Sequence, residues 1–416
     1  GFIGGQVSLL PHQFYIADTI TNRFIPRVLL SDETGLGKTI EACLVLHKLI
    51  ISHKVSRVLI IVPQALVHQW FVELYRKFNL SFMVFSEDYC QELSQPGSSD
   101  NPFSQHQLCI MGMDLLCDTA RFEQIQSAGW DMLVIDEAHH ITDSATLFSH
   151  ISALAASVRG LMLLTATPEQ MGQKNHFSHL QLIDPDRYFS FDQFLKEAAN
   201  YEKTAGKIKN KKISGKSLEH YLDAYGPGRV IFKNKRSVVQ GFPKRICHLM
   251  PLNTDRQTQT KANQEILKSD DVADLSYTND PRIACLVDLI EQKDKILVIT
   301  RTRDQAKAIE DAVAQNISTS LVRFDESMTL MQRDRHAAFF ARPDGAQVLV
   351  CSEIGSEGRN FQFVHHLLLF DLPMNPELVE QRIGRLDRIG QKNDIHIWIP
   401  YLKNSVQHIL AQWYME

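Results

Sequence analysis

The sequence predicts an α/β protein made of two similar units in tandem. Its 416 residues exceed what one hydrophobic core usually organises, and 44% hydrophobic with 22% charged residues is the composition of an ordinary globular protein. In both halves, short and nearly all-apolar runs alternate with longer amphipathic stretches. This alternation is typical of mostly parallel sheets that are covered by helices on both faces.

Nine apolar runs predict the strands of the two sheets. In the first half they span 58–62, 108–111, 132–135 and 161–164. In the second half they span 296–300, 321–324, 347–351, 366–371 and 395–399. We therefore expect a first unit at 1–190 and a second unit at 246–416, joined by residues 191–245.

The joining segment 191–245 is predicted to be a basic linker or a helical insertion. Its apolar period fades, and its basic residues face few acids: Lys203, Lys207, Lys209, Lys211, Lys212, Lys216, Lys233, Lys235 and Arg236. One interpretation is a solvated connector, and the other is a surface that contacts phosphates. The net charge of −4 gives no bulk attraction to polyanions, so such a contact would depend on local clusters.

The composition argues against a secreted or membrane protein. The seven cysteines form no C-x-x-C pair and lie mostly in apolar runs, which is typical of core residues in a reducing cytosol. Neither a signal peptide nor an 18-residue apolar run is found. We expect a soluble, cytoplasmic monomer without a membrane anchor. Because the chain starts with Gly1 and not with Met, we also expect it to be a fragment.

A phosphate-binding loop is predicted between a candidate strand at 28–30 and a helix over 40–50. The loop consists of Asp32, Glu33, Thr34, Gly35, Leu36, Gly37, Lys38 and Thr39. In this pattern backbone N–H groups surround the β-phosphate of ATP, Lys38 reaches the β and γ oxygens, and Thr39 ligates Mg²⁺. Asp32 stands where the pattern usually has its first glycine, so we expect Gly35 to share the turn.

Two carboxylates at the end of the apolar run 132–135 strengthen the nucleotide hypothesis. Asp136 is expected to hold Mg²⁺ through water, and Glu137 to orient and deprotonate the water that attacks the γ-phosphate. The alternative is a helix N-cap made of the same two acids. His139 and His140 lack a third ligand at suitable spacing, so we expect them to pack or to couple motifs and not to bind metal.

Polar groups also follow two other predicted strands. Thr165 and Thr167 end a strand of the first half, where they could sense the γ-phosphate or simply lead into a turn. The loop 352–360 follows a strand of the second half and carries Gly358. This loop could face nucleotide or a nucleic-acid backbone, and we assign Gly358 to the nucleotide.

Candidate arginine fingers lie near the end of the chain. Arg385 and Arg388 are three residues apart, so on a helix they would project from one face toward one target. Positive charge of this kind speeds phosphoryl transfer by roughly 10³ to 10⁵. Arg382 could join them or face solvent. The alternative, a surface helix held by salt bridges, is disfavoured by Gly384 and Gly390, since glycine is a poor helix former.

The order and spacing of these motifs resemble the Swi/Snf-type branch of superfamily 2 motors. The resemblance rests on the loop 35–39, the D-E-A-H box at 136–139 and the segment 381–391, and it covers nearly the whole chain. It implies two tandem RecA-like lobes and an ATP hydrolase that depends on nucleic acid. It further implies translocation along double-stranded nucleic acid, DNA in the first place, without strand separation.

The same resemblance assigns further residues. Gln13, in a segment similar to the family's adenine-reading element, would contact the base. Gly355, Gly358 and Asn360 match the family's fifth motif.

A closer resemblance is to the RNA polymerase-associated ATPases of bacteria. It rests on residues 9–13, 241–245, 351–362 and 380–391. It implies association with RNA polymerase, recycling of that enzyme after transcription, and a place near the nucleoid in the bacterial cytoplasm. Two alternatives stay open: a remodelling or defence ATPase of the same branch with another partner, and a nucleotide-gated clamp that binds nucleic acid without sustained turnover.

Overall fold

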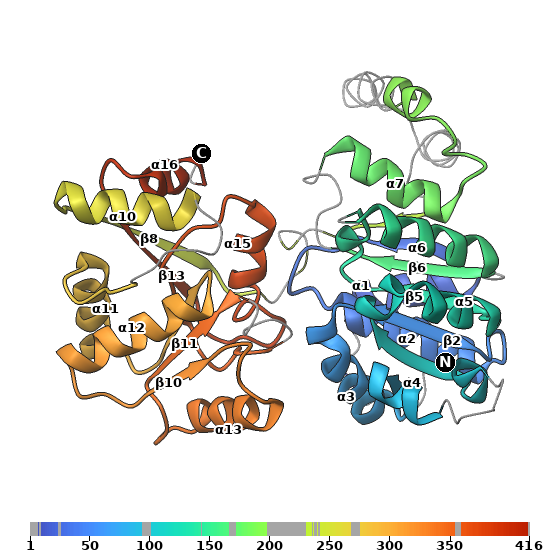
Figure 1. Cartoon of the computed structure of the whole chain (residues 1–416), viewed down its shortest axis with the longest axis horizontal. Coiled ribbons are helices and arrows are strands. Elements are labelled where there is room, and N and C mark those ends of the chain that lie inside the picture. The colour runs from blue at the N-terminus through green and yellow to red at the C-terminus, as the bar shows by residue number, and fades with distance from the viewer. Residues whose placement is uncertain are drawn as a thin grey trace. The chain divides into compact units, whose positions relative to one another are not determined.

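The chain divides into two compact units, Gly1–Val239 and Gln240–Glu416. Figure 1 shows the first unit in blue to green and the second in yellow to red. The computed structural model describes residues 7, 10–23, 26–93, 101–142, 144–165, 172–197, 230–234, 236, 239, 242–267, 275–353 and 359–414. Each unit is described by itself.

The first unit is built on a parallel sheet of seven strands in the order β3-β4-β2-β5-β6-β1-β7. The strands are β1 Arg27–Leu30, β2 Val58–Val62, β3 Met83–Phe85, β4 Leu108–Gly112, β5 Met132–Ile135, β6 Gly160–Leu164 and β7 Ile231–Phe232. The central strands β2, β5 and β6 are buried along their whole length. Because alternate side chains of a strand point to opposite faces, each central strand contributes side chains to the hydrophobic core on each face of the sheet.

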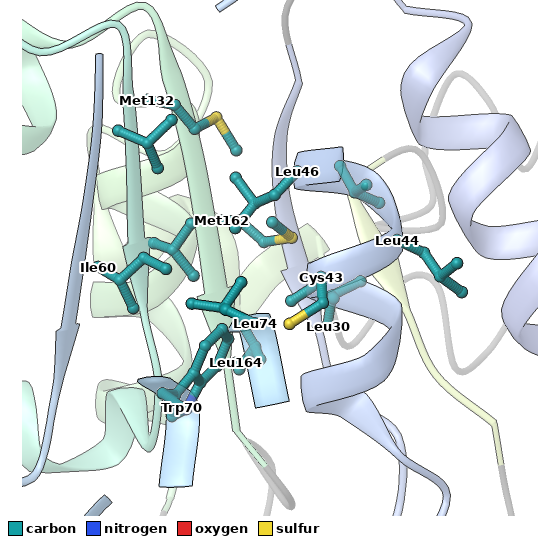
Figure 2. Close-up of a cluster of buried hydrophobic side chains, with 14 of the residues drawn as sticks. Leu30, Cys43, Leu44, Leu46, Ile60, Trp70, Leu74, Met132, Met162 and Leu164 are labelled. Carbon is teal, nitrogen blue, oxygen red and sulfur yellow. The ribbon is translucent and has the colours of Figure 1, made fainter. Parts of the chain in front are cut away.

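Helices cover both faces of this sheet (Figure 1). The helices are α1 Pro11–Thr21, α2 Lys38–Ile51, α3 Val67–Phe78, α4 Glu87–Leu93, α5 Thr119–Ser127, α6 Ala145–Ser157 and α7 Gln173–Ile183, with short 3₁₀ turns η1 Gln64–Leu66, η2 Pro102–Gln105, η3 Met113–Cys117 and η4 Ala138–Thr142. Helices α1, α2 and α3 share one core with Ile60 of β2, and α5, α6 and α7 share the other with Ile61. In Figure 2, Trp70 and Leu74 of α3 and Cys43 of α2 lie in the first core.

The second unit repeats the plan with six parallel strands in the order β10-β11-β9-β12-β13-β8. The strands are β8 Arg245–Leu252, β9 Ile296–Thr300, β10 Leu321–Phe324, β11 Val348–Ser352, β12 His366–Leu369 and β13 Ile395–Leu402. The helices are α10 Arg256–Leu267, α11 Pro281–Gln292, α12 Arg303–Asn316, α13 Leu330–Ala341, α15 Pro376–Ile383 and α16 Val406–Trp413. Two buried clusters again fill the two faces of the sheet.

The predicted fold class, two α/β units with parallel sheets, is confirmed, and each of the nine predicted apolar runs forms a strand. The sequence did not reveal β3, β7 and β8. Strand β7 has two residues, and β8 has no fully buried side chain, so neither produces an apolar run. Strand β7 lies within the predicted joining segment and pairs with β1. Residues 198–229, which carry six of the basic residues named above, lie outside the described part of the chain.

Among the described residues, no helix has both the length and the apolar character that crossing a membrane requires.

Candidate active site

The phosphate loop leaves the sheet at the carboxyl end of β1. Ser31 and Asp32 are fully buried, and the chain then turns through Gly35 and Gly37, both with φ of 90°. Gly37 is the N-cap of α2 and offers no side chain to the first N–H groups of that helix. These unsatisfied donors, with the positive end of the helix dipole, form an anion site.

Gln13 of α1 packs directly against this loop. Its side chain is 3% exposed, and its Nε2 donates to the carbonyl of Leu36 at 3.0 Å. A Cβ atom at Gly37 would lie 2.5 Å from the same nitrogen, so the close approach of α1 requires glycine here as much as the positive φ does. The structure thus gives Gln13 a contact with the loop, and its contact with adenine stays a prediction.

Lys38 connects the end of the loop to its beginning. Its Nζ donates to the backbone carbonyl of Asp32 at 2.8 Å, and Thr39 follows it in the first turn of α2. One turn further, Glu41 is fully buried, and its two carboxylate oxygens have no hydrogen-bond partner among the described residues. Burial first, and then the neighbouring charge of Asp32, raise the pKa of Glu41 well above its ordinary value. Sequence reasoning missed Glu41 because its position is an ordinary one for a helix surface.

The Asp32 side chain is held by Asn234. Its carboxylate accepts hydrogen bonds from the backbone N–H of Asn234 at 2.7 Å and from the side-chain Nδ2 of Asn234 at 2.9 and 3.1 Å. Glu33 accepts from the backbone N–H of Arg236 at 2.8 Å. Both partners lie about half the chain away, and no pattern in the sequence connects them to the loop.

Asp136 and Glu137 follow β5 at the same edge of the sheet. The Asp136 carboxylate accepts from the indole Nε1 of Trp70 at 2.7 Å and from the backbone N–H of Glu137 at 2.8 Å. Burial, and then the adjacent charge of Glu137, raise the pKa of Asp136 to about 7, while Lys38 is near enough to oppose this rise. The structure therefore brings the two predicted motifs together.

These residues fit a bound Mg²⁺. Asp136 is a buried carboxylate whose pKa is raised to about 7, so a divalent cation beside it would favour its ionised form. Carboxylate and hydroxyl oxygens are the ligands that Mg²⁺ prefers, and Asp136 and Thr39 offer one of each. No contact between these two side chains is required, because Mg²⁺ usually keeps several waters.

The Glu137 backbone is strained, and its side chain has a histidine neighbour. Its φ of 46° is unusual for a residue with a side chain, and such strain is common at functional sites. The Oε2 atom of Glu137 lies 3.4 Å from Nδ1 of His139.

Thr165, at the end of β6, has a buried hydroxyl with no hydrogen-bond partner among the described residues, whereas Thr167 lies outside them.

His179 of α7 contacts the backbone directly after Asp136 and Glu137. It is fully buried, and its Nε2 lies 2.9 Å from the carbonyl of Ala138. Burial, with a smaller contribution from His176, lowers the pKa of His179 to about 4. The folded chain therefore holds a neutral imidazole at this position.

We expect His179 to make folding of the first unit sensitive to acid. Its pKa is about 4 in the folded chain, against about 6.5 when unfolded, so its contribution is complete above pH 6.5 and is lost as the pH falls toward 4. The difference corresponds to about 3 kcal/mol. Denaturant titrations between pH 7 and pH 4.5 should show a flatter loss of stability for His179→Gln than for wild type. The exposed control His68→Gln should keep the wild-type slope, and equal slopes for all three proteins would contradict this role.

In the second unit the expected helical geometry of the two arginine fingers is wrong. Helix α15 ends at Ile383 with Gly384 as its C-cap, so Arg385 lies in the turn that follows and Arg388 in irregular chain beyond it. Gly384 has a right-handed backbone, so it acts through its poor helix propensity and not through a left-handed cap. Arg388 Nε donates to the carbonyl of Gly384 at 2.9 Å, and its Nη2 to the carbonyl of Arg359 at 3.4 Å.

Arg382 neither joins the other arginines nor faces solvent. It is 2% exposed and donates to the carboxylates of Asp371 at 2.9 Å and Glu353 at 2.7 Å. Arg245 of β8 also binds the segment that carries the arginines, since it donates to the carboxylates of Asp387 at 2.5 Å and Glu380 at 2.9 Å.

Of the fifth-motif residues, Gly355 and Gly358 lie outside the described residues, and Asn360 is exposed.

Known protein families match nearly the whole described chain. Residues 22–305 match the SNF2-related domain, and residues 281–390 match the helicase conserved C-terminal domain. The RNA polymerase-associated protein RapA of Vibrio campbellii (strain ATCC BAA-1116) is 40% identical over 486 residues, covering 100% of this chain and 50% of that protein. The chain thus spans about half the length of this curated relative.

Two solved structures of the Sulfolobus solfataricus SWI2/SNF2 ATPase core are also similar. The core in complex with dsDNA matches with a TM-score of 0.49 and 18% identity, over 99% of this chain and 92% of that one. The core domain alone matches with a TM-score of 0.46 and 18% identity, over 100% and 90%.

Proposed function

Because the chain belongs to the SNF2-related family, as the resemblance of its motifs indicated, we propose that it hydrolyses ATP to translocate along double-stranded nucleic acid. The observation that carries the proposal is the convergence of Lys38, Asp136 and Glu137 at one edge of the first sheet. ATP is the substrate and Mg²⁺ the metal that such sites ordinarily use.

The residues divide the chemistry between them. The N–H groups at the start of α2 and the ammonium of Lys38 bind the β- and γ-phosphates, which displaces Lys38 from the Asp32 carbonyl. Thr39 and Asp136 would hold Mg²⁺, which would neutralise charge on the phosphates. Glu137 accepts a proton from the attacking water, whose oxygen bonds to the γ-phosphorus as the bond to ADP breaks.

The second unit supplies positive charge to the transition state through Arg385 and Arg388. The first unit has the phosphate loop and the two carboxylates, and the arginines lie about 250 residues further along the chain. On this proposal ATP binds chiefly to the first unit, and hydrolysis requires the second unit to close on it. Nucleic acid that contacts both units would favour the closed state.

We further propose duplex DNA as the track and RNA polymerase as the partner. The support is the 40% identity to a protein whose name associates it with RNA polymerase. The chain would then act in transcription, in the bacterial cytoplasm close to the nucleoid, and as a monomer. Retention on core RNA polymerase in a pull-down tests the partnership, and no retention would favour a remodelling or defence ATPase of the same family.

Displacement of a third DNA strand from a duplex tests translocation directly. We expect the chain to release the third strand when ATP is present and to fail with a non-hydrolysable ATP analogue. Duplex binding that responds to ATP, but without release of the third strand, would identify a nucleotide-gated clamp and contradict translocation.

A further inference from the structure

Residues 230–234 and 236, here called the strap, run beside β1 and continue along the phosphate loop. The backbone N–H of Leu29 donates to the carbonyl of Val230 at 2.8 Å, and that of Ser31 to the carbonyl of Phe232 at 2.7 Å. The same ladder continues beyond the strand, because the N–H of Glu33 donates to the carbonyl of Asn234 at 3.2 Å. The strap therefore accompanies the chain into the loop that binds phosphate.

Asn234 joins the strap to the loop through its backbone and its side chain. Three hydrogen bonds, one from its backbone N–H and two from its side-chain amide, reach the two oxygens of Asp32. Asp32 is fully buried, so these donors, and not water, supply the hydrogen bonds to its side-chain oxygens. Hydrogen bonds to an ionised, buried carboxylate are stronger than those between neutral groups.

Asp32 connects Asn234 to the catalytic lysine. The side chain of Asp32 is held by Asn234, while its backbone carbonyl accepts from Lys38 Nζ at 2.8 Å. A shift of Asp32 would therefore move the peptide that Lys38 contacts and the start of the turn at Gly35. Asp32 stands where the usual loop pattern has glycine, and both oxygens of its side chain accept hydrogen bonds from Asn234 of the strap.

We propose that Asn234 is a positioning residue for ATP binding, which acts through the Asp32 carboxylate to hold the phosphate loop in its binding geometry. The inference rests on the proposed function, because it presumes that the loop binds ATP. It assigns Asp32 a role in shaping the site in place of contact with the nucleotide. Asn234 is predicted to affect ATP affinity and KM more than kcat, since it touches no reacting atom.

An exchange of amide and carboxylate between the two positions tests the proposal. Asn234→Asp places a second carboxylate against Asp32, and Asp32→Asn removes one of the acceptor oxygens. The double variant, with both substitutions, restores one amide facing one carboxylate. Asn234→Ala, which removes only the side-chain amide, serves if Asn234→Asp does not fold. Asn175→Asp in α7 is the matched control, because it makes the same chemical change in the same unit, on a helix that belongs neither to the strap nor to the loop.

The readouts are the Kd for a fluorescent ATP analogue, the KM for ATP, and the melting temperature of each variant of the whole 416-residue chain. We expect Asn234→Asp to raise Kd and KM by about tenfold or more, which is the change in affinity that corresponds to the free energy of one lost charge-assisted hydrogen bond. Asn234→Ala should raise them by about threefold or more, the double variant should return to within about threefold of wild type, and Asn175→Asp should match wild type.

Two results would overturn the inference. One is a folded Asn234 variant with wild-type ATP affinity, including one whose melting temperature alone is lowered, which would make Asn234 a purely structural residue. The other is a double variant no better than the worse single one. Failure of wild type itself to bind the ATP analogue would instead refute the proposed function, and this inference with it.

Discussion

Glu137→Gln is expected to lower ATP turnover by about 10³-fold or more while ATP affinity stays within a few-fold of wild type. The amide keeps the size and polarity of the side chain but cannot accept the proton of the attacking water, and general bases contribute about 10²–10⁴-fold. Asp136, Lys38 and the loop glycines remain in place, so the nucleotide site stays intact. The measurements are steady-state ATP turnover and the Kd for ATP in the presence of Mg²⁺.

The control for this prediction is Glu123→Gln. Glu123 is exposed on α5, and the same amide substitution there should leave both turnover and affinity unchanged. Near wild-type turnover of Glu137→Gln would show that Glu137 is not the base. Loss of ATP binding by that variant would show instead that its carboxylate is needed to build the site.

Arg388→Ala is expected to reduce turnover by roughly 10³-fold, the lower end of what an arginine finger contributes, while ATP affinity changes much less. The variant lacks the positive charge that stabilises the transition state, so addition of duplex DNA should not restore turnover. Arg388 also donates to two backbone carbonyls, so a structural effect must be separated from a chemical one. A melting temperature near that of wild type, measured on the same preparation, makes that separation.

Arg385→Ala and Arg335→Ala complete the arginine experiment. Arg385→Ala should also lower turnover, whereas Arg335, exposed on α13, serves as the control and should be silent. If Arg385→Ala and Arg388→Ala both turn over ATP at the wild-type rate, the second unit does not complete the site.

The strands and the two catalytic motifs could be predicted because each has a local pattern. The run 132–135 is apolar throughout and ends in Asp136 and Glu137, so one short window contains both the strand and its chemistry. The loop 32–39 is similarly local. Even the strained φ of Glu137 lies at a residue that the pattern had already marked.

The contacts that hold these motifs in place could not be predicted, because they join distant parts of the chain. Asn234 contacts Asp32 across 202 positions, and Trp70 contacts Asp136 across 66. Neither partner stands in a motif of its own. Hydrogen bonds of this kind depend on strand order, which places β7 beside β1, and periodicity alone does not determine strand order.

The geometry of the arginines shows a different limit. A spacing of three residues suggested one helical face, but Gly384 ends the helix before Arg385 is reached. The sequence contains this glycine, which disfavours a helix kept only for stability. Its direct consequence, a helix that stops at Ile383, decides instead where both side chains lie.

The most direct test of the proposed ATPase activity is steady-state ATP turnover by the whole chain, with and without duplex DNA. Glu137→Gln, measured in the same way, gives the background rate. We predict turnover well above the Glu137→Gln background, rising about tenfold or more when duplex DNA is added. Turnover equal to that of Glu137→Gln under both conditions would contradict the claim that Lys38, Asp136 and Glu137 form an ATP-hydrolysing site.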